Sequence, residues 1–181
     1  MPKPIEAGRT CLWCLCIAAC VALMLPCAGR AAAAGAPPSD LGPDEPAFAD
    51  GGQTAGITQS GTSQWATINQ NGSGNAAWVV QSMANNAAAV TQAGVQNTVT
   101  LKQSGDGNQA SLYQQGSRNA ISTSQVGNGD TASMTQAGVA NSATVQQLGN
   151  GDSVQLRQSG AYQSIAIRQV GNGMHAMVVQ H

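Results

Sequence analysis

Aromatic and charged side chains are scarce in this chain of 181 residues. Only 3% of the residues are aromatic, and Phe48 is the single Phe, whereas aromatic side chains normally dominate the burial of a globular core. Charged residues make up 8% of the chain, and the formal net charge is -1. Nucleic acids and anionic membrane surfaces attract clustered Lys and Arg, so the composition argues against both kinds of partner.

Cysteine is absent after residue 27. The five cysteines are Cys11, Cys14, Cys16, Cys20 and Cys27. The rest of the chain therefore predicts neither a disulfide framework nor a zinc site, and we expect no cofactor.

The first 34 residues have the pattern of a secretory signal peptide. Lys3 and Arg9 give a weakly basic start, residues 11–25 form an apolar run of 15, and residues 31–34 are small. A transmembrane anchor is one alternative, but 15 residues are few for a membrane span. A lipoprotein signal at Cys20 is another, although the apolar run continues past it. We therefore expect removal of residues 1–34.

Residues 35–52 are rich in Pro and in acidic residues. Such a segment buries too little apolar area to offset the entropy lost on folding. We interpret it as a disordered leader or targeting tail, with a plain linker as the alternative.

One spacing organises residues 53–181, because Gln recurs every 11 residues without a miss. The series is Gln59, Gln70, Gln81, Gln92, Gln103, Gln114, Gln125, Gln136, Gln147, Gln158, Gln169 and Gln180. Gly follows two residues after nearly every Gln, with Met83 as the exception. These glycines are Gly61, Gly72, Gly94, Gly105, Gly116, Gly127, Gly138, Gly149, Gly160 and Gly171.

The remaining positions of the repeat are also regular. A small or β-branched residue stands four before each Gln, and an aliphatic residue stands two before it, except at Thr123. The commonest residue six before the Gln is Asn, at Asn75, Asn86, Asn97, Asn108, Asn119 and Asn141. Asp130 and Asp152 take this place in two repeats. The unit is therefore N-x-A-x-V-x-Q-x-G-x-x.

The spacing of two between these positions predicts β-strands, because alternate residues of a strand share one face. By this alternation Trp65, Trp78 and Tyr113 should point outward. An 11-residue period also occurs in right-handed helical coiled coils. Gly in almost every period would cost a helix about 1 kcal/mol each relative to Ala, so we favour strands. The recurrent Gly then provides a conformation in which the chain can turn.

Twelve strands joined by tight turns predict an all-β, amyloid-like β-solenoid of about six 22-residue rungs, with two stacked parallel sheets. Stacking places Gln above Gln and Asn above Asn, so the buried amides can form hydrogen-bonded ladders. A single rung buries too little to be stable, and stability grows with the height of the stack. Since matching ends can stack on each other, we expect homopolymeric filaments.

These residues resemble the curlin repeat family, the subunits of bacterial curli. The resemblance covers residues 53–181 and is clearest in residues 73–81, 104–116 and 126–149. It implies a secreted functional amyloid of the biofilm matrix, exported through a dedicated outer-membrane pore. The implied partners are the subunit itself, other curlin subunits, the secretion pore, and host or abiotic surfaces to which the fibre adheres. The family has a major subunit and a nucleator, and the repeat leaves both roles open.

Other functions have less support from the sequence. Catalysis is not expected, because the chain beyond residue 34 has only His175 and His181 as histidines and suggests no nucleophile–base pair. The sequence GNGD occurs at 127–130 and 149–152, but a calcium-binding roll needs Asp in every turn. A monomeric ice- or surface-binding solenoid would show outward Thr in one column, which the spacing does not give.

Charged residues interrupt the neutral core at a few positions: Lys102, Asp106, Arg118, Asp130, Asp152, Arg157 and Arg168. We interpret the three Asp side chains as scattered, solvated carboxylates. The charged set either slows premature aggregation or provides ordinary surface solubility.

Overall fold

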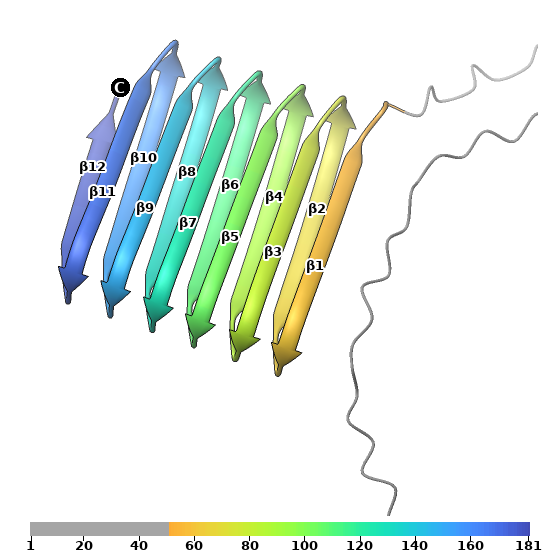
Figure 1. Ribbon diagram of the computed structural model, residues 1–181. Coiled ribbons are helices and arrows are strands. Elements are labelled where there is room, and N and C mark those ends of the chain that lie inside the picture. Colours follow the sequence, from red (N-terminus) through yellow and green to blue (C-terminus); the bar gives the residue numbers. More distant parts are fainter. Residues whose placement is uncertain (1–50) are drawn as a thin grey trace, which may run out of the picture.

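The computed structural model describes residues 51–181 (Figure 1). The expected signal peptide at 1–34 and all but the last two residues of the expected leader at 35–52 lie outside the described residues. The strands are β1 (Thr54–Thr62), β2 (Trp65–Ser73), β3 (Ala76–Ala84), β4 (Ala87–Val95), β5 (Thr98–Asp106), β6 (Gln109–Ser117), β7 (Ala120–Asn128), β8 (Thr131–Val139), β9 (Ser142–Asn150), β10 (Ser153–Ala161), β11 (Ser164–Asn172) and β12 (His175–Gln180).

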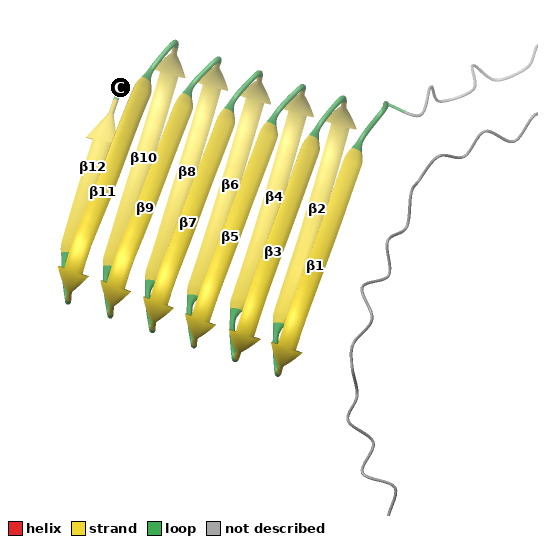
Figure 2. Ribbon diagram, viewed as in Figure 1, coloured by secondary structure: helices red, strands yellow, loops and turns green. Residues whose placement is uncertain are grey.

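The twelve strands form two six-stranded parallel sheets. Odd-numbered strands stack in the order β1-β3-β5-β7-β9-β11, and even-numbered strands stack from β2 to β12 in the same way. Figure 2 shows short turns joining each strand to the next at both edges of the sandwich. The predicted β-solenoid of six 22-residue rungs is confirmed.

The register between rungs is constant. Each residue of an inner strand lies beside the residue 22 positions further along, for example Gln81 beside Gln103 and Gln114 beside Gln136. Identical positions of the repeat therefore form columns that run along the stack.

The core lies between the two sheets and follows the predicted alternation. In the four inner rungs, the aliphatic residues two before each Gln, such as Leu101 and Val145, are buried. Thr123 occupies the same place, and its hydroxyl donates to Met134 Sδ at 3.1 Å, which satisfies the one polar group in this position. Trp65 and Trp78 are 56% and 43% exposed, so the outward orientation predicted for them is confirmed.

Burial declines at the two end rungs. Ile57 and Ile68 of the first rung and Ile167 and Val178 of the last are only partly buried, because each packs against one neighbouring rung instead of two. Among residues 51–181, no helix has the length and apolar character needed to cross a membrane.

Candidate assembly interface

The Gln side chains form two hydrogen-bonded columns, one per sheet. In each column the Nε2 of one Gln donates to the Oε1 of the Gln on the next rung, over 2.7–3.0 Å. Gln59, Gln81, Gln103, Gln125, Gln147 and Gln169 lie in one column, and Gln70, Gln92, Gln114, Gln136, Gln158 and Gln180 in the other. Every donor in these contacts points toward the C-terminal end of the stack.

Most of these glutamines also connect the two sheets. Gln103 Nε2 donates to the carbonyl of Ala87 in β4 at 3.2 Å, and Gln147 Nε2 donates to the carbonyl of Thr131 in β8 at 3.1 Å. The side chains of Gln103 and Gln147 are fully buried. Such buried amides are stable only because their polar atoms are bonded within the stack.

The Asn side chains bond mainly to the backbone at the corners of the rungs. Asn119 is representative: its Nδ2 donates to the carbonyls of Gln115 and Gly138, both at 3.0 Å, and its Oδ1 accepts from the N–H of Asn141 at 3.1 Å. Asn75, Asn86, Asn97, Asn108, Asn119 and Asn141 all lie at this position and are buried. They therefore satisfy corner groups of the backbone that the strands leave unpaired.

The expectation that Asp130 and Asp152 are solvated is wrong. They are 0% and 1% exposed because they occupy the corner position of Asn and point inward as Asn does. The Oδ1 of Asp130 accepts from the N–H of Asp152 at 3.0 Å, but the Oδ2 atoms of both residues have no hydrogen-bond partner. Burial raises the pKa of Asp130 above its usual value. Asp106, by contrast, is exposed.

The glycines two residues after Gln adopt positive φ values of 111–159°. A Cβ on Gly138 would overlap the carbonyl oxygen of Gly160 in the next rung, and the same overlap recurs along both columns from Gly61 to Gly149. Gly160 and Gly171 in the last rungs differ, since the nearest atoms to a Cβ there are Gln163 Nε2 at 3.2 Å and Met174 Sδ at 3.5 Å. A carbonyl oxygen of the next rung therefore restricts this position to glycine where another rung follows, except at Met83, which adopts a φ of 80°.

A second left-handed residue follows two positions after these glycines, at a place that the predicted unit N-x-A-x-V-x-Q-x-G-x-x leaves unspecified. It is Gly at Gly74, Gly107, Gly129, Gly151 and Gly173, with φ of 64–71°, and non-Gly at Ser63, Asn85, Gln96, Arg118, Ala140 and Tyr162, with φ of 53–58°. The recurrence of Gly at this position, in every second repeat from Gly107 onward, was the available signal.

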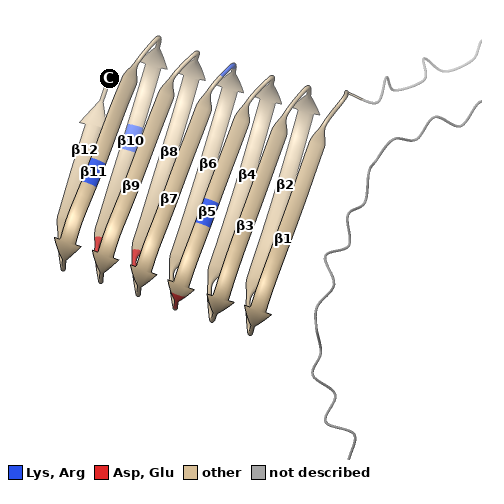
Figure 3. Cartoon of the chain, viewed as in Figure 1, with Lys and Arg blue, Asp and Glu red and all other residues tan. Residues whose placement is uncertain are grey.

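The charged side chains are few and separated. Figure 3 shows the basic residues of the described part of the chain on strands β5, β10 and β11 and at one corner, with its Asp residues at the opposite edge. Residues 51–181 contain no group of three or more His, Cys, Asp and Glu side chains that could hold a metal ion.

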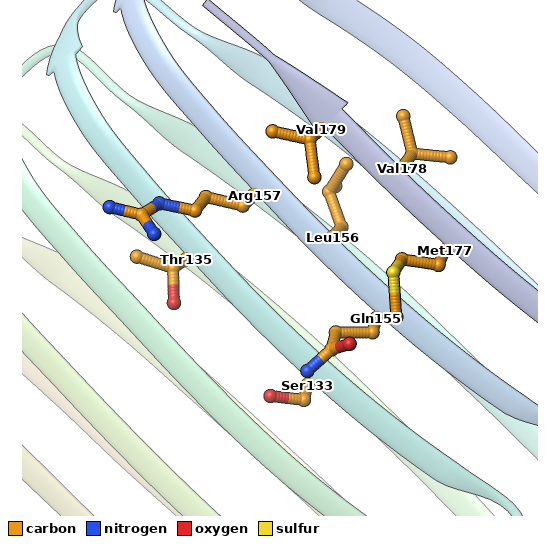
Figure 4. Close-up of a pocket in the computed structure, with 8 residues that line it drawn as sticks. All are labelled: Ser133, Thr135, Gln155, Leu156, Arg157, Met177, Val178 and Val179. Atoms are coloured by element: carbon orange, nitrogen blue, oxygen red, sulfur yellow. The ribbon is translucent and has the colours of Figure 1, made fainter.

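A surface pocket lies over β8, β10 and β12 near the last rung (Figure 4). Met177, which is 74% exposed, lies beside Gln155, and Val179 lies beside Arg157. The pocket lining also includes the hydroxyl groups of Ser133 and Thr135 and the amide of Gln155.

Comparison with protein families gives one match. The model of the curlin associated repeat matches residues 54–82, 84–116, 96–127, 105–138 and 127–160, which together cover more than half of the chain. A comparison with curated proteins gives no match. The repeat, the two stacked sheets and this match lead to one conclusion: the chain belongs to the curlin repeat family.

Proposed function

We propose that this protein is the structural subunit of an extracellular curli-type amyloid fibre that grows by stacking the rungs of successive molecules. The role is structural and needs no catalytic group or cofactor. Secretion, passage through a curli export pore, and adhesion of the fibre to host or abiotic surfaces are parts of the same proposal.

The polarity of the Gln columns carries this proposal. Because each Nε2 donates toward the C-terminal end, the first rung presents the acceptor oxygens of Gln59 and Gln70 without a Gln donor. The last rung has the Nε2 atoms of Gln169 and Gln180 without a Gln acceptor. Donors meet acceptors only when the last rung of one molecule stacks on the first rung of another. This head-to-tail contact does not close on itself and so builds a filament.

The glycines of the last rungs support the same arrangement. Gly160 and Gly171 leave open the space that the next carbonyl oxygen fills at every earlier glycine of the columns. A stacked molecule would place the backbone of its own first rung there. The space is therefore suited to a continuing stack.

Unpaired sheet edges add further support. Within residues 51–181, no strand lies beyond β1 and β2 at one end or beyond β11 and β12 at the other. Open strand edges present backbone donors and acceptors to an incoming strand, and proteins that stay monomeric usually block such edges.

Of the two subunit roles, we propose that of the major fibre former. The last rung keeps its place in the Gln column, since Gln158 Nε2 donates to Gln180 Oε1 at 2.8 Å, and Val178 packs against the core. Both ends can therefore act as templates. A nucleator subunit is the alternative, and a monomeric surface- or ice-binding solenoid is a second.

Fibre diffraction of the purified secreted protein tests the proposal. We expect a meridional reflection near about 4.7 Å and an equatorial one near about 10 Å. A protein that stays monomeric at high concentration, or fibres without the meridional reflection, would contradict it.

Seeding distinguishes the subunit roles. The protein should elongate from its own sonicated fibres, and deletion of residues 174–181 should slow this elongation. Assembly without a lag, together with acceleration of a second curlin at a low molar ratio, would favour the nucleator role instead.

A further inference from the structure

Two acidic residues interrupt a column of corner amides. Gln64, Asn86, Asn108, Asp130, Asp152 and Met174 follow one another at intervals of 22 residues, and we call them the corner column. The Oδ1 atoms of its Asn and Asp members accept from the backbone N–H one rung further on, at 2.9–3.1 Å. One oxygen of each carboxyl group therefore replaces the Asn oxygen.

The second oxygen cannot replace the Asn nitrogen. Nδ2 of Asn108 donates to the carbonyls of Ser104 at 3.4 Å and Gly127 at 2.9 Å. The register puts the carbonyls of Val126 and Gly149 in the matching places for Asp130. A carboxylate has no hydrogen to donate to a carbonyl, and Oδ2 of Asp130 is buried without a partner.

A neutral carboxyl group solves this problem. It has nearly the shape of the carboxamide, and its O–H can donate where Asn donates. We propose that the Asp130–Asp152 pair takes up at least one proton when the solenoid forms, so that acidification promotes assembly. This inference rests on the proposed fibre and identifies a means of regulating it.

The surroundings of the pair offer no buried counter-charge. The charged or titratable side chains on the strands of the adjoining rungs are exposed, and these are Lys102, Asp106, Tyr113, Arg157, Arg168 and His175. Burial raises the pKa of Asp130 and outweighs the hydrogen bond from the N–H of Asp152, which lowers it. Repulsion from the Asp152 carboxyl raises the pKa of Asp130 further, and the backbone N–H of Gly151, with the smallest effect, lowers it.

The sign of the effect follows from linkage. A carboxyl group whose pKa is raised by folding binds its proton more tightly in the folded state. Its favourable effect on folding is complete below the ordinary pKa of 3.8 and is lost as the pH rises toward the folded value. The assembled state should therefore be more stable in acid than at neutral pH.

The test compares the purified protein with the double variant Asp130→Asn/Asp152→Asn, which restores the residue found at Asn86 and Asn108. Asp106→Asn is the matched control, because Asp106 is exposed. Seeded assembly is run to equilibrium at about pH 4 and about pH 7.5, and the protein left in solution is measured. One proton changes an equilibrium constant by up to tenfold for each pH unit between the ordinary and the folded pKa, so we expect several-fold more soluble wild-type protein at the higher pH.

The double variant should assemble equally at both pH values, and Asp106→Asn should behave as wild type. If the double variant keeps the wild-type pH dependence, the inference is overturned while the fibre proposal stands. If millimolar calcium at about pH 7.5 promotes assembly of the wild type as acid does, but has no such effect on the double variant, the pair binds a cation. This result also overturns the inference.

An infrared spectrum keeps the two proposals separate. If none of the proteins forms fibres, the proposed function fails, and the infrared spectrum of the folded protein is recorded at about pH 5, where an ordinary Asp carboxyl group is mostly ionised. A C=O stretch of a protonated carboxyl group, absent from the double variant, supports proton uptake by the pair. Absence of this band from the wild type overturns it.

Discussion

At the scale of single residues, the buried amides determine how one rung meets the next. Gln147 accepts from Gln125 Nε2 and donates to Gln169 Oε1, both at 3.0 Å, within a fully buried column. Its neighbour Gln146 belongs to the same strand but faces outward and is exposed. Two chemically identical side chains therefore have different consequences for stability.

We expect Gln147→Ala to weaken the stack strongly. The change leaves Gln125 and Gln169 each with a buried polar atom that has lost its Gln partner, at a cost of about 1–3 kcal/mol per group. Soluble protein at equilibrium with fibres should rise by about tenfold or more, since tenfold corresponds to about 1.4 kcal/mol. Gln146→Ala is the control and should stay within about twofold of wild type; equal effects of the two changes would argue against a role for the buried column.

At the scale of the strand and its turn, two left-handed positions shape each corner for different reasons. The first, such as Gly138, lies against the backbone of the next rung. The second, such as Gly129, has no atom within 4 Å of a Cβ, and Asn85 adopts a similar φ at the same position of the repeat. At the first position the neighbouring rung limits which residue fits, whereas at the second only the backbone conformation does.

Gly138→Ala should therefore be much more harmful than Gly129→Asn. The Ala side chain would push β8 and β10 apart. Overpacking of this kind costs about 1–3 kcal/mol, and an Ala residue with a positive φ adds backbone strain. Asn tolerates the left-handed region, so Gly129→Asn should change little. The measurement is the denaturant concentration that dissolves preformed fibres. Equal midpoints for the two variants would contradict the steric role of Gly138.

At the scale of the whole molecule, the stack has two different ends. In a parallel sheet, alternate residues direct their N–H and C=O groups to opposite neighbours. The N–H of Ser142 in β9 donates to the carbonyl of Gln163 in the next rung, and the matching position of the last rung is Ser164. The backbone N–H groups of Ser164 and Ala166 thus face the unpaired edge of β11.

Pro at position 166 should block growth at this end. Ala166→Pro removes an N–H that has no partner within the described part of the chain, so the solenoid should still fold, as edge strands tolerate Pro. An incoming molecule would lose a ladder hydrogen bond and meet the proline ring. We expect elongation of Ala166→Pro seeds by wild-type protein to fall at least about tenfold at the β11 end, as followed by single-fibre microscopy. Ala166→Thr is the control; unimpaired two-ended growth of the Pro variant would contradict the head-to-tail contact.

Much of this structure could be predicted from the repeat alone. A period of 11 with apolar residues at intervals of two leaves only strands that turn after each unit, and the constant period makes every rung stack in the same register. The inward position of Gln and Asn followed from the same alternation. Because each position recurs about twelve times, one local pattern determined the twelve strands and their order.

The tertiary structure alone decided what each polar group contacts. Asp130 and Asp152 looked like surface charges because Asp is usually solvated, yet the corner they share with Asn encloses them. The sequence could not distinguish the Gln side chains, which bond to one another, from the Asn side chains, which bond mainly to the corner backbone. Periodicity determines which face a side chain occupies, but its partners depend on the path of the backbone at the corner and on the rung above.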